Sequence, residues 1–180
     1  MNRAGYETLV AALGEYGARN PGCRATAEVS RFVTTEERWW QRENVRGHVT
    51  ASAWIVDRAA RAALLVHHRK LQRWLQPGGH LENDDSIHAA ALREAREETG
   101  VVDLQWHTTT IFDIDIHTIP ERKDFPAHSH LDVRFLFEGD RNTPLQCSEE
   151  SLALRWCSFA ELPTLGTDES VLRLARKTPR

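Results

Sequence analysis

The chain contains little cysteine, and its cysteines do not form a recognisable pattern. There are three in 180 residues, Cys23, Cys147 and Cys157, scattered along the chain and without CxxC spacing. An odd, dispersed set of this kind is typical of reduced thiols in the cytoplasm. We therefore expect a cytoplasmic protein with neither a disulfide framework nor a cysteine zinc site.

Long apolar runs and an excess of positive charge are lacking as well. No segment approaches the roughly 18 apolar residues of a membrane span, and the N-terminus has no cationic stretch followed by an apolar run. The formal net charge of −3 argues against general nucleic-acid or membrane-surface binding. Without internal repeats or a convincing linker, the length fits a single domain over residues 1–180.

The most informative stretch is residues 79–101, whose second half predicts a helix. Ser86 offers an N-cap and Gly100 stands where a C-terminal glycine stop belongs. At about 100° per residue, one stripe of this helix carries small apolar residues followed by acids. The stripe consists of Ile87, Ala90, Ala91, Glu94 and Glu98, with Glu97 beside it.

Three carboxylates on the inward side of a helix need a compensating charge. At about 5 Å and an effective dielectric near 20, each pair repels by roughly 3 kcal/mol, and partial burial adds desolvation. A divalent cation offsets this most simply, and oxygen ligands favour Mg²⁺ or Mn²⁺ over zinc. The alternative is a solvated acidic helix end with Arg93 and Arg96 as ordinary partners, and the spacing alone leaves both interpretations open.

Gly79, Asp85 and the run from Arg93 to Val101 together resemble the Nudix box of the Nudix hydrolase superfamily. That box reads Gly, five residues, Glu, seven residues, then Arg-Glu-aliphatic-any-Glu-Glu-any-Gly-aliphatic. Asp85 replaces the first glutamate, and the other fixed positions match. Residues 74–79 also resemble the approach to the box, and a weaker resemblance extends over about residues 47–162.

The resemblance implies an α/β fold, a Nudix α/β/α sandwich with a mixed sheet, here preceded by a helical N-terminal extension over residues 1–45. It implies hydrolysis of the pyrophosphate linkage of a nucleoside diphosphate joined to another group. Mg²⁺, or Mn²⁺, would be held by Glu94, Glu97, Glu98 and the Gly79 carbonyl. Arg93 would orient these acids, and Asp85, one methylene shorter than glutamate, alters their support.

Relatives often draw a further glutamate from outside the box, for metal binding or base catalysis. Glu150 is the first candidate and Glu149 the second, and a solvated acidic loop is the alternative for each. The basic loop over residues 67–74 is either a solvated turn or a contact for an anionic substrate through Arg69, Lys70 or Arg73. We include Lys70 and Trp74 among the expected substrate contacts.

Residues 128–137 predict a strand with one polar face, made of His128, His130, Asp132 and Arg134. The face has three interpretations. It could face solvent, it could line the substrate groove with His128, His130 and Arg134 near phosphate oxygens, or it could hold a second metal, with His80 as a further ligand. The sequence does not decide among them.

The remaining alternatives concern the N-terminal extension and the function. Helical spacing predicts a helix through Leu9, Val10, Leu13 and Tyr16, then a break at residues 20–22 and a helix over about 25–32. Trp39 and Trp40 favour buried packing over base stacking. A non-catalytic nucleotide-sensing or partner-binding module remains an alternative function. An isopentenyl diphosphate isomerase is disfavoured, since Gly78 occupies the place of its cysteine. Substrate, general base and a homodimeric state are left open.

Overall fold

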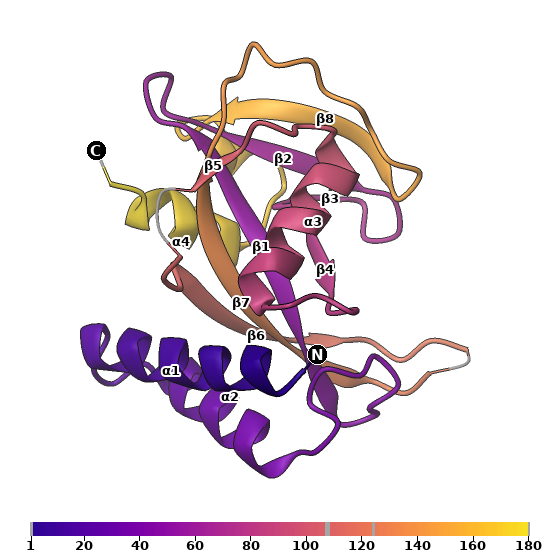
Figure 1. The fold of residues 1–180 in the computed structure, drawn as a ribbon. Helices are drawn as coiled ribbons and strands as arrows, with labels where there is room; N and C mark the ends of the chain where they lie inside the picture. The colour runs from indigo at the N-terminus through magenta and orange to yellow at the C-terminus, as the bar shows by residue number, and fades with distance from the viewer. Residues whose placement is uncertain (1, 107–108, 124, 180) are drawn as a thin grey trace. The chain divides into compact units, whose positions relative to one another are not determined.

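The computed structural model describes residues 2–106, 109–123 and 125–179. Its elements, in chain order (Figure 1), are α1 Arg3–Arg19, α2 Arg24–Thr35, β1 Gly47–Asp57, β2 Ala62–His68, β3 Arg73–Leu75, β4 Gly78–His80, α3 Ile87–Thr99, β5 Gln105–Trp106, β6 Asp113–Ile119, β7 His128–Glu138, β8 Ser151–Ser158, the 3₁₀ helix η1 Leu162–Thr164 and α4 Glu169–Lys177. No helix within these ranges has the length and apolarity needed to cross a membrane.

The two N-terminal helices form as the sequence predicts. Asn2 caps α1 by accepting a hydrogen bond from the Gly5 amide at 2.8 Å. Of the four residues with helical spacing, Leu9, Leu13 and Tyr16 are buried, whereas Val10 is exposed. The predicted break falls between α1 and α2, and α2 lies beside α1 and also contacts β6 (Figure 1).

The predicted strand is present, together with several others. β2 pairs antiparallel with β1, β3 and β8, and its first five residues are buried, as expected of a continuous apolar run. β7 covers the predicted strand over residues 128–137 and pairs antiparallel with β6 and β5. β5 ends at Trp106 and β6 begins at Asp113, and residues 107–108 between them lie outside the described ranges.

Hydrogen-bonded neighbours in the sheet follow the order β3–β2–β1–β7–β5, with β4 on β1, β6 on β7 and β8 on β2. This confirms the predicted fold class, an α/β fold with a mixed sheet and helices at the N-terminus. α4 begins after Asp168, whose side chain caps the helix by accepting a hydrogen bond from the Val171 amide.

The chain divides into two compact units, and β1, α3 and β7 each contribute residues to both. The first unit comprises Met1–Ala51, Gly79–Ala91 and Thr110–Phe135; the second comprises Ser52–Gly78, Leu92–Thr109 and Leu136–Arg180. In the second unit the buried Trp54 indole donates to the Thr178 hydroxyl at 2.8 Å, which ties β1 to the end of α4. The assignment of residues 1–180 to one domain stays a prediction.

Candidate active site

Local sequence fixes both ends of α3. The Ser86 hydroxyl accepts a hydrogen bond from the Ala89 amide at 3.1 Å, and this completes the predicted N-cap. Gly100 has φ of +73°, and its amide donates to the Arg96 carbonyl at 2.8 Å. A Cβ at Gly100 would also lie 2.6 Å from the Gln146 Cβ, so glycine is required there for two reasons.

The acidic residues of α3 differ in exposure as the predicted stripe requires. Glu98 is buried at 7% exposure, Glu94 is half-buried, and the Glu97 side chain is 57% exposed. Arg93 donates from Nη1 to Glu94 at 2.9 Å and to Glu97 at 3.0 Å. Glu98 instead accepts a hydrogen bond from the Gly78 amide at 3.0 Å, which fastens the end of the helix to β4.

Burial and mutual repulsion raise the pKa of the two inward acids. Desolvation is the main cause of the raised pKa of Glu98, which reaches about 7, and the charges of Glu94, Glu150 and Glu97 add to it. Desolvation also raises the pKa of Glu94, against the opposing ion pair with Arg93. The surroundings of Glu94 and Glu98 therefore disfavour the ionised form of both carboxyl groups.

Glu150 belongs to the same electrostatic cluster. Its negative charge contributes to the raised pKa of both Glu94 and Glu98. Arg69 holds the backbone around it, since the guanidinium donates to the carbonyls of Glu149 and Ser151 at 2.9 and 3.2 Å. The amide of Arg69 donates to the carbonyl of Glu150 itself at 3.0 Å. The basic loop thus positions the acidic loop, a role that the sequence did not indicate.

The donor set fits a hard divalent cation. Four carboxylates, from Glu94, Glu97, Glu98 and Glu150, act on one another electrostatically, and Arg93 pairs with two of them, Glu94 and Glu97. These five side chains carry a formal charge of −3 when all are ionised. Carboxylate oxygens are the ligands that Mg²⁺ and Mn²⁺ prefer. A cation bound here would relieve both the repulsion and the desolvation that raise the pKa of Glu98.

The other predicted residues of the box lie in the first compact unit. Gly79 follows Gly78 within β4, and Asp85 is exposed just before the cap of α3. The carbonyl ligand at Gly79 and the supporting role of Asp85 stay predictions. Gly78 itself lies against Ser52, where an added Cβ would come within 2.3 Å of the hydroxyl and 2.7 Å of the Cα.

Lys70 lies in the turn between β2 and β3, and Trp74 lies within β3. Lys70 is exposed, and its amide donates to the His68 ring. Trp74 is half-buried with its indole stacked on His67, the ring centroids lying 4.9 Å apart. An exposed ammonium and a partly open aromatic ring are suited to contact with a nucleotide, and both assignments remain predictions.

The polar face of β7 is largely buried. Arg134 is 2% exposed and donates from Nε to Asp132 at 2.7 Å. It also pairs with Asp113 and Asp115, at 3.6 and 3.3 Å. The solvent interpretation therefore does not hold for Asp132 and Arg134. A guanidinium surrounded by three carboxylates favours a structural role for Arg134 over contact with phosphate, although its substrate role stays untested.

Histidines gather at the beginning of this face. His128 and His130 lie beside His48 of β1, with ring centroids 5.2 and 4.6 Å from the His48 ring. His80 is also a neighbour, at 4.9 Å from His48. Sequence reasoning missed His48, because the pairing of β1 with β7 cannot be read from alternation within either strand.

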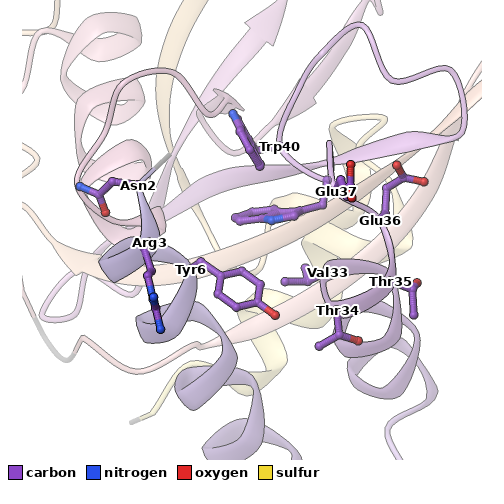
Figure 2. Close-up of a pocket in the computed structure, with 10 residues that line it drawn as sticks. Asn2, Arg3, Tyr6, Val33, Thr34, Thr35, Glu36, Glu37 and Trp40 are labelled. Carbon is purple, nitrogen blue, oxygen red and sulfur yellow. The ribbon is translucent and has the colours of Figure 1, made fainter.

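Trp39 and Trp40 line a hollow of about 530 Å³ in the N-terminal part of the chain (Figure 2). Trp39 is buried and meets Trp40 edge to face, with 5.3 Å between the ring centroids, so buried packing describes it correctly. Glu36 and Glu37 also line the hollow. Their negative charge disfavours a phosphate-bearing ligand at this place.

Comparisons with known proteins identify the family and the fold of this chain. The model of the NUDIX domain matches residues 46–175. A NUDIX-family hydrolase from Clostridium perfringens shares 29% identity over 71% of this chain and 93% of its own, with a TM-score of 0.54. Two further structures share the fold at a TM-score of 0.56. The E. coli dihydroneopterin triphosphate pyrophosphohydrolase is 15% identical, over 72% and 92% of the two chains, and the MutT protein from Methanosarcina mazei Go1 is 18% identical, over 74% and 94%.

No curated protein matches the chain. The family model nevertheless covers well over half of the sequence, and it includes the complete acidic face of α3. The chain belongs to the Nudix hydrolase family, whose members generally use divalent metal ions.

Proposed function

We propose that this protein is a Mg²⁺-dependent pyrophosphohydrolase that cleaves the pyrophosphate linkage of a nucleoside diphosphate joined to another group. The observation that carries the proposal is the pair of inward carboxylates on α3. Glu98 is buried, held by the Gly78 amide, and has a pKa raised to about 7. Carboxylates whose pKa is raised by burial and by neighbouring acids are typical of functional sites, and a bound cation would stabilise their charged form.

Glu94, Glu97 and Glu98 would hold Mg²⁺, together with the carbonyl of Gly79, and Mn²⁺ would serve as a substitute. When bound, the ion supplies positive charge that offsets the negative charge on the pyrophosphate oxygens. Arg93 fixes the carboxylates of Glu94 and Glu97 by its two hydrogen bonds. These side chains therefore lose little conformational entropy when the ion binds.

Glu150 would provide a carboxylate from outside the helix, as a further metal ligand or as the base that takes a proton from the attacking water. The backbone around it is fixed by Arg69, and its charge acts on Glu94 and Glu98. Lys70 and Trp74 would meet the phosphate and base of the substrate. A cytoplasmic location and a homodimer stay predictions that accompany this function.

The test is turnover across a panel of diphosphate compounds, measured with Mg²⁺ and with EDTA. The panel includes a dinucleoside tetraphosphate and a pterin triphosphate, because similar folds include an Ap4A hydrolase from C. elegans and the dihydroneopterin enzyme. We expect Mg²⁺-dependent phosphate release from at least one compound, lost in Glu97→Gln and Glu98→Gln. Nucleotide binding without any turnover across the panel would instead indicate a sensing module.

A pair of neighbouring variants tests the role of Glu150. Glu150→Gln should lower kcat by about 100- to 10,000-fold, as expected when a general base is removed. The matched change Glu149→Gln alters the same acidic loop and should have little effect, because the structure uses the backbone carbonyl of Glu149 and not its carboxylate. Equal losses in the two variants would contradict the assignment.

A further inference from the structure

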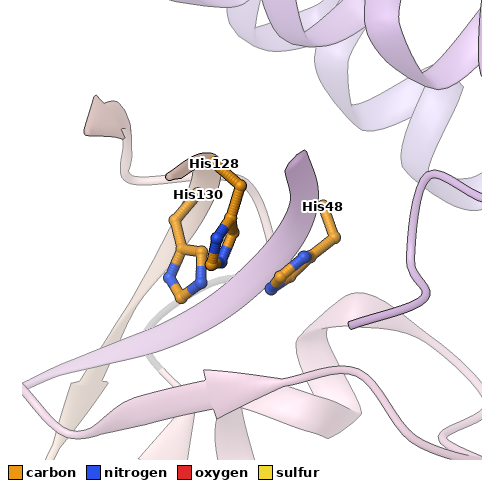
Figure 3. A group of neighbouring side chains, drawn as sticks. All are labelled: His48, His128 and His130. Atoms are coloured by element: carbon orange, nitrogen blue, oxygen red, sulfur yellow. The ribbon is translucent and has the colours of Figure 1, made fainter. Parts of the chain in front are cut away.

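Three imidazole rings converge at one place within the first compact unit (Figure 3). His48 is the second residue of β1, and His128 and His130 are the first and third residues of β7. Each ring offers one nitrogen such that these three atoms all lie within 4.8 Å of one another. The rings come from two strands that are distant in sequence, so local spacing alone does not create the cluster.

The His48 ring is buried, and the backbone of Asn44 is a hydrogen-bonding neighbour that acts on its pKa. The residue is 1% exposed, and among the described residues neither ring nitrogen makes a hydrogen bond of ordinary geometry. Buried polar atoms of this kind are rare and point to a missing ligand or water. Figure 3 shows the His48 ring directed toward the other two rings.

The tautomer of His128 is already suited to metal binding. Its Nδ1 lies 2.9 Å from the carbonyl oxygen of Pro126. A carbonyl can only accept, so Nδ1 carries the proton and Nε2 keeps its lone pair. Histidine ligands of metals are commonly held in this way, with one ring nitrogen donating to a carbonyl or carboxylate while the other binds the ion.

Acidic side chains lie near the three histidines, in the next residues of β7 and on the neighbouring strand β6. Two residues after His48, the Thr50 hydroxyl donates to Asp132, which lies two residues after His130. Asp132 belongs with Asp113 and Asp115 to the group of acids around Arg134, and these four side chains carry a formal charge of −2. A cation beside the histidines would therefore bind in a favourable field.

We propose that His48, His128 and His130 bind Zn²⁺ or a similar divalent transition-metal ion, at a site distinct from the carboxylate site on α3. Imidazole nitrogens suit Zn²⁺, Ni²⁺ or Cu²⁺ and are not ligands that Mg²⁺ selects. Ligation at about 2.0–2.1 Å in a tetrahedron needs nitrogens about 3.3 Å apart, so the rings must close by roughly 1.5 Å. His80, whose ring centroid is 5.5 Å from that of His130, is the adjacent candidate for a fourth ligand.

The ion would join the beginning of β1 to the beginning of β7. Zn²⁺ at a concentration about 100-fold above its Kd should therefore raise the melting temperature by roughly 5–10 °C. The proposal does not depend on pyrophosphatase activity, because its readouts are metal binding and stability. Failure of the hydrolase assignment would leave it unchanged.

The experiment is a Co²⁺ titration of the full chain without a histidine tag, stripped of metal beforehand, and followed by visible absorption. We expect one Co²⁺ per chain with the bands of a four-coordinate ion, displaced by Zn²⁺ and retained in millimolar Mg²⁺. His128→Ala and His130→Ala should each weaken binding by about 100-fold or more. His67→Ala, which removes a histidine stacked on Trp74, should bind Co²⁺ as the unaltered chain does.

Two results would overturn the proposal. One is the lack of saturable Co²⁺ binding by the unaltered chain, and the other is undiminished binding by His128→Ala and His130→Ala. Far-UV circular dichroism and the metal-free melting temperature report whether each variant folds. Should His130→Ala fail to fold, His128→Ala decides the question, because that ring lies at the partly exposed end of β7.

Discussion

The substitution Glu98→Gln should abolish turnover and at the same time stabilise the protein in the absence of metal. Glu98 is 7% exposed, and its carboxyl group has a pKa raised from 4.5 to about 7, mainly because it is desolvated. At pH 8 the ionised form therefore costs the folded state up to about 3 kcal/mol. Glutamine has the same shape, carries no charge, and keeps an oxygen to accept from the Gly78 amide.

The expected gain is about 2 kcal/mol, because the new amide group loses about 1 kcal/mol if its own hydrogens stay unpaired. For a chain of this length that corresponds to a melting temperature higher by about 4–8 °C. The sign depends on pH. Between pH 4.5 and 7 the folded state of the unaltered chain binds more protons than the unfolded state, so its stability falls as pH rises, and the variant lacks this decline.

The assay is urea unfolding in EDTA at pH 4 and pH 8, followed by the fluorescence of the six tryptophans. Added Mg²⁺ should stabilise the unaltered chain and leave the variant unchanged. Glu97→Gln is the matched control, since that side chain is 57% exposed and its loss should shift stability by less than about 0.5 kcal/mol. The reasoning would be refuted if, at pH 8, the unfolding free energy of Glu98→Gln were equal to or lower than that of the unaltered chain.

Three further predictions concern stability. Burial, in contact with Phe135, lowers the pKa of His88 to about 4. The unfolding free energy should therefore fall by up to about 3 kcal/mol as the pH drops from 6.5 to 4, and it should fall less over the same pH range in His88→Leu. Gly78→Ala should cost about 1–3 kcal/mol in urea unfolding because its Cβ meets Ser52, and unaltered stability would contradict the close packing seen there. Arg134→Met leaves three buried or half-buried carboxylates without their shared cation and should lower the unfolding free energy by about 3–5 kcal/mol, with Arg134→Lys intermediate.

Local patterns predicted the elements that local interactions determine. The ends of α3 follow from Ser86 and Gly100, each of which acts on backbone within four residues. The burial of Glu98 was predictable from helical periodicity, because its position around the helix axis places it on the same side as the apolar residues of α3. The strand over residues 128–137 followed in the same way from alternation.

Long-range placement was not predictable from one sequence. His48 joins His128 and His130 only because β1 and β7 share a sheet, and the register between strands 80 residues apart leaves no trace in either one. Arg69 was expected to meet solvent or substrate, yet it holds the backbone on both sides of Glu150. Neither contact has a signature in the spacing of the residues that make it.

The close approach of Gly78 to Ser52 bears on how readily this chain could acquire isomerase chemistry. A cysteine introduced at position 78 would press its first side-chain carbon against the neighbouring strand, within 2.7 Å of main chain. Trimming the Ser52 hydroxyl alone would not make room, because the obstructing Cα remains. Any ancestor or designed relative that exchanges one activity for the other must therefore separate these two strands before the thiol can be accommodated.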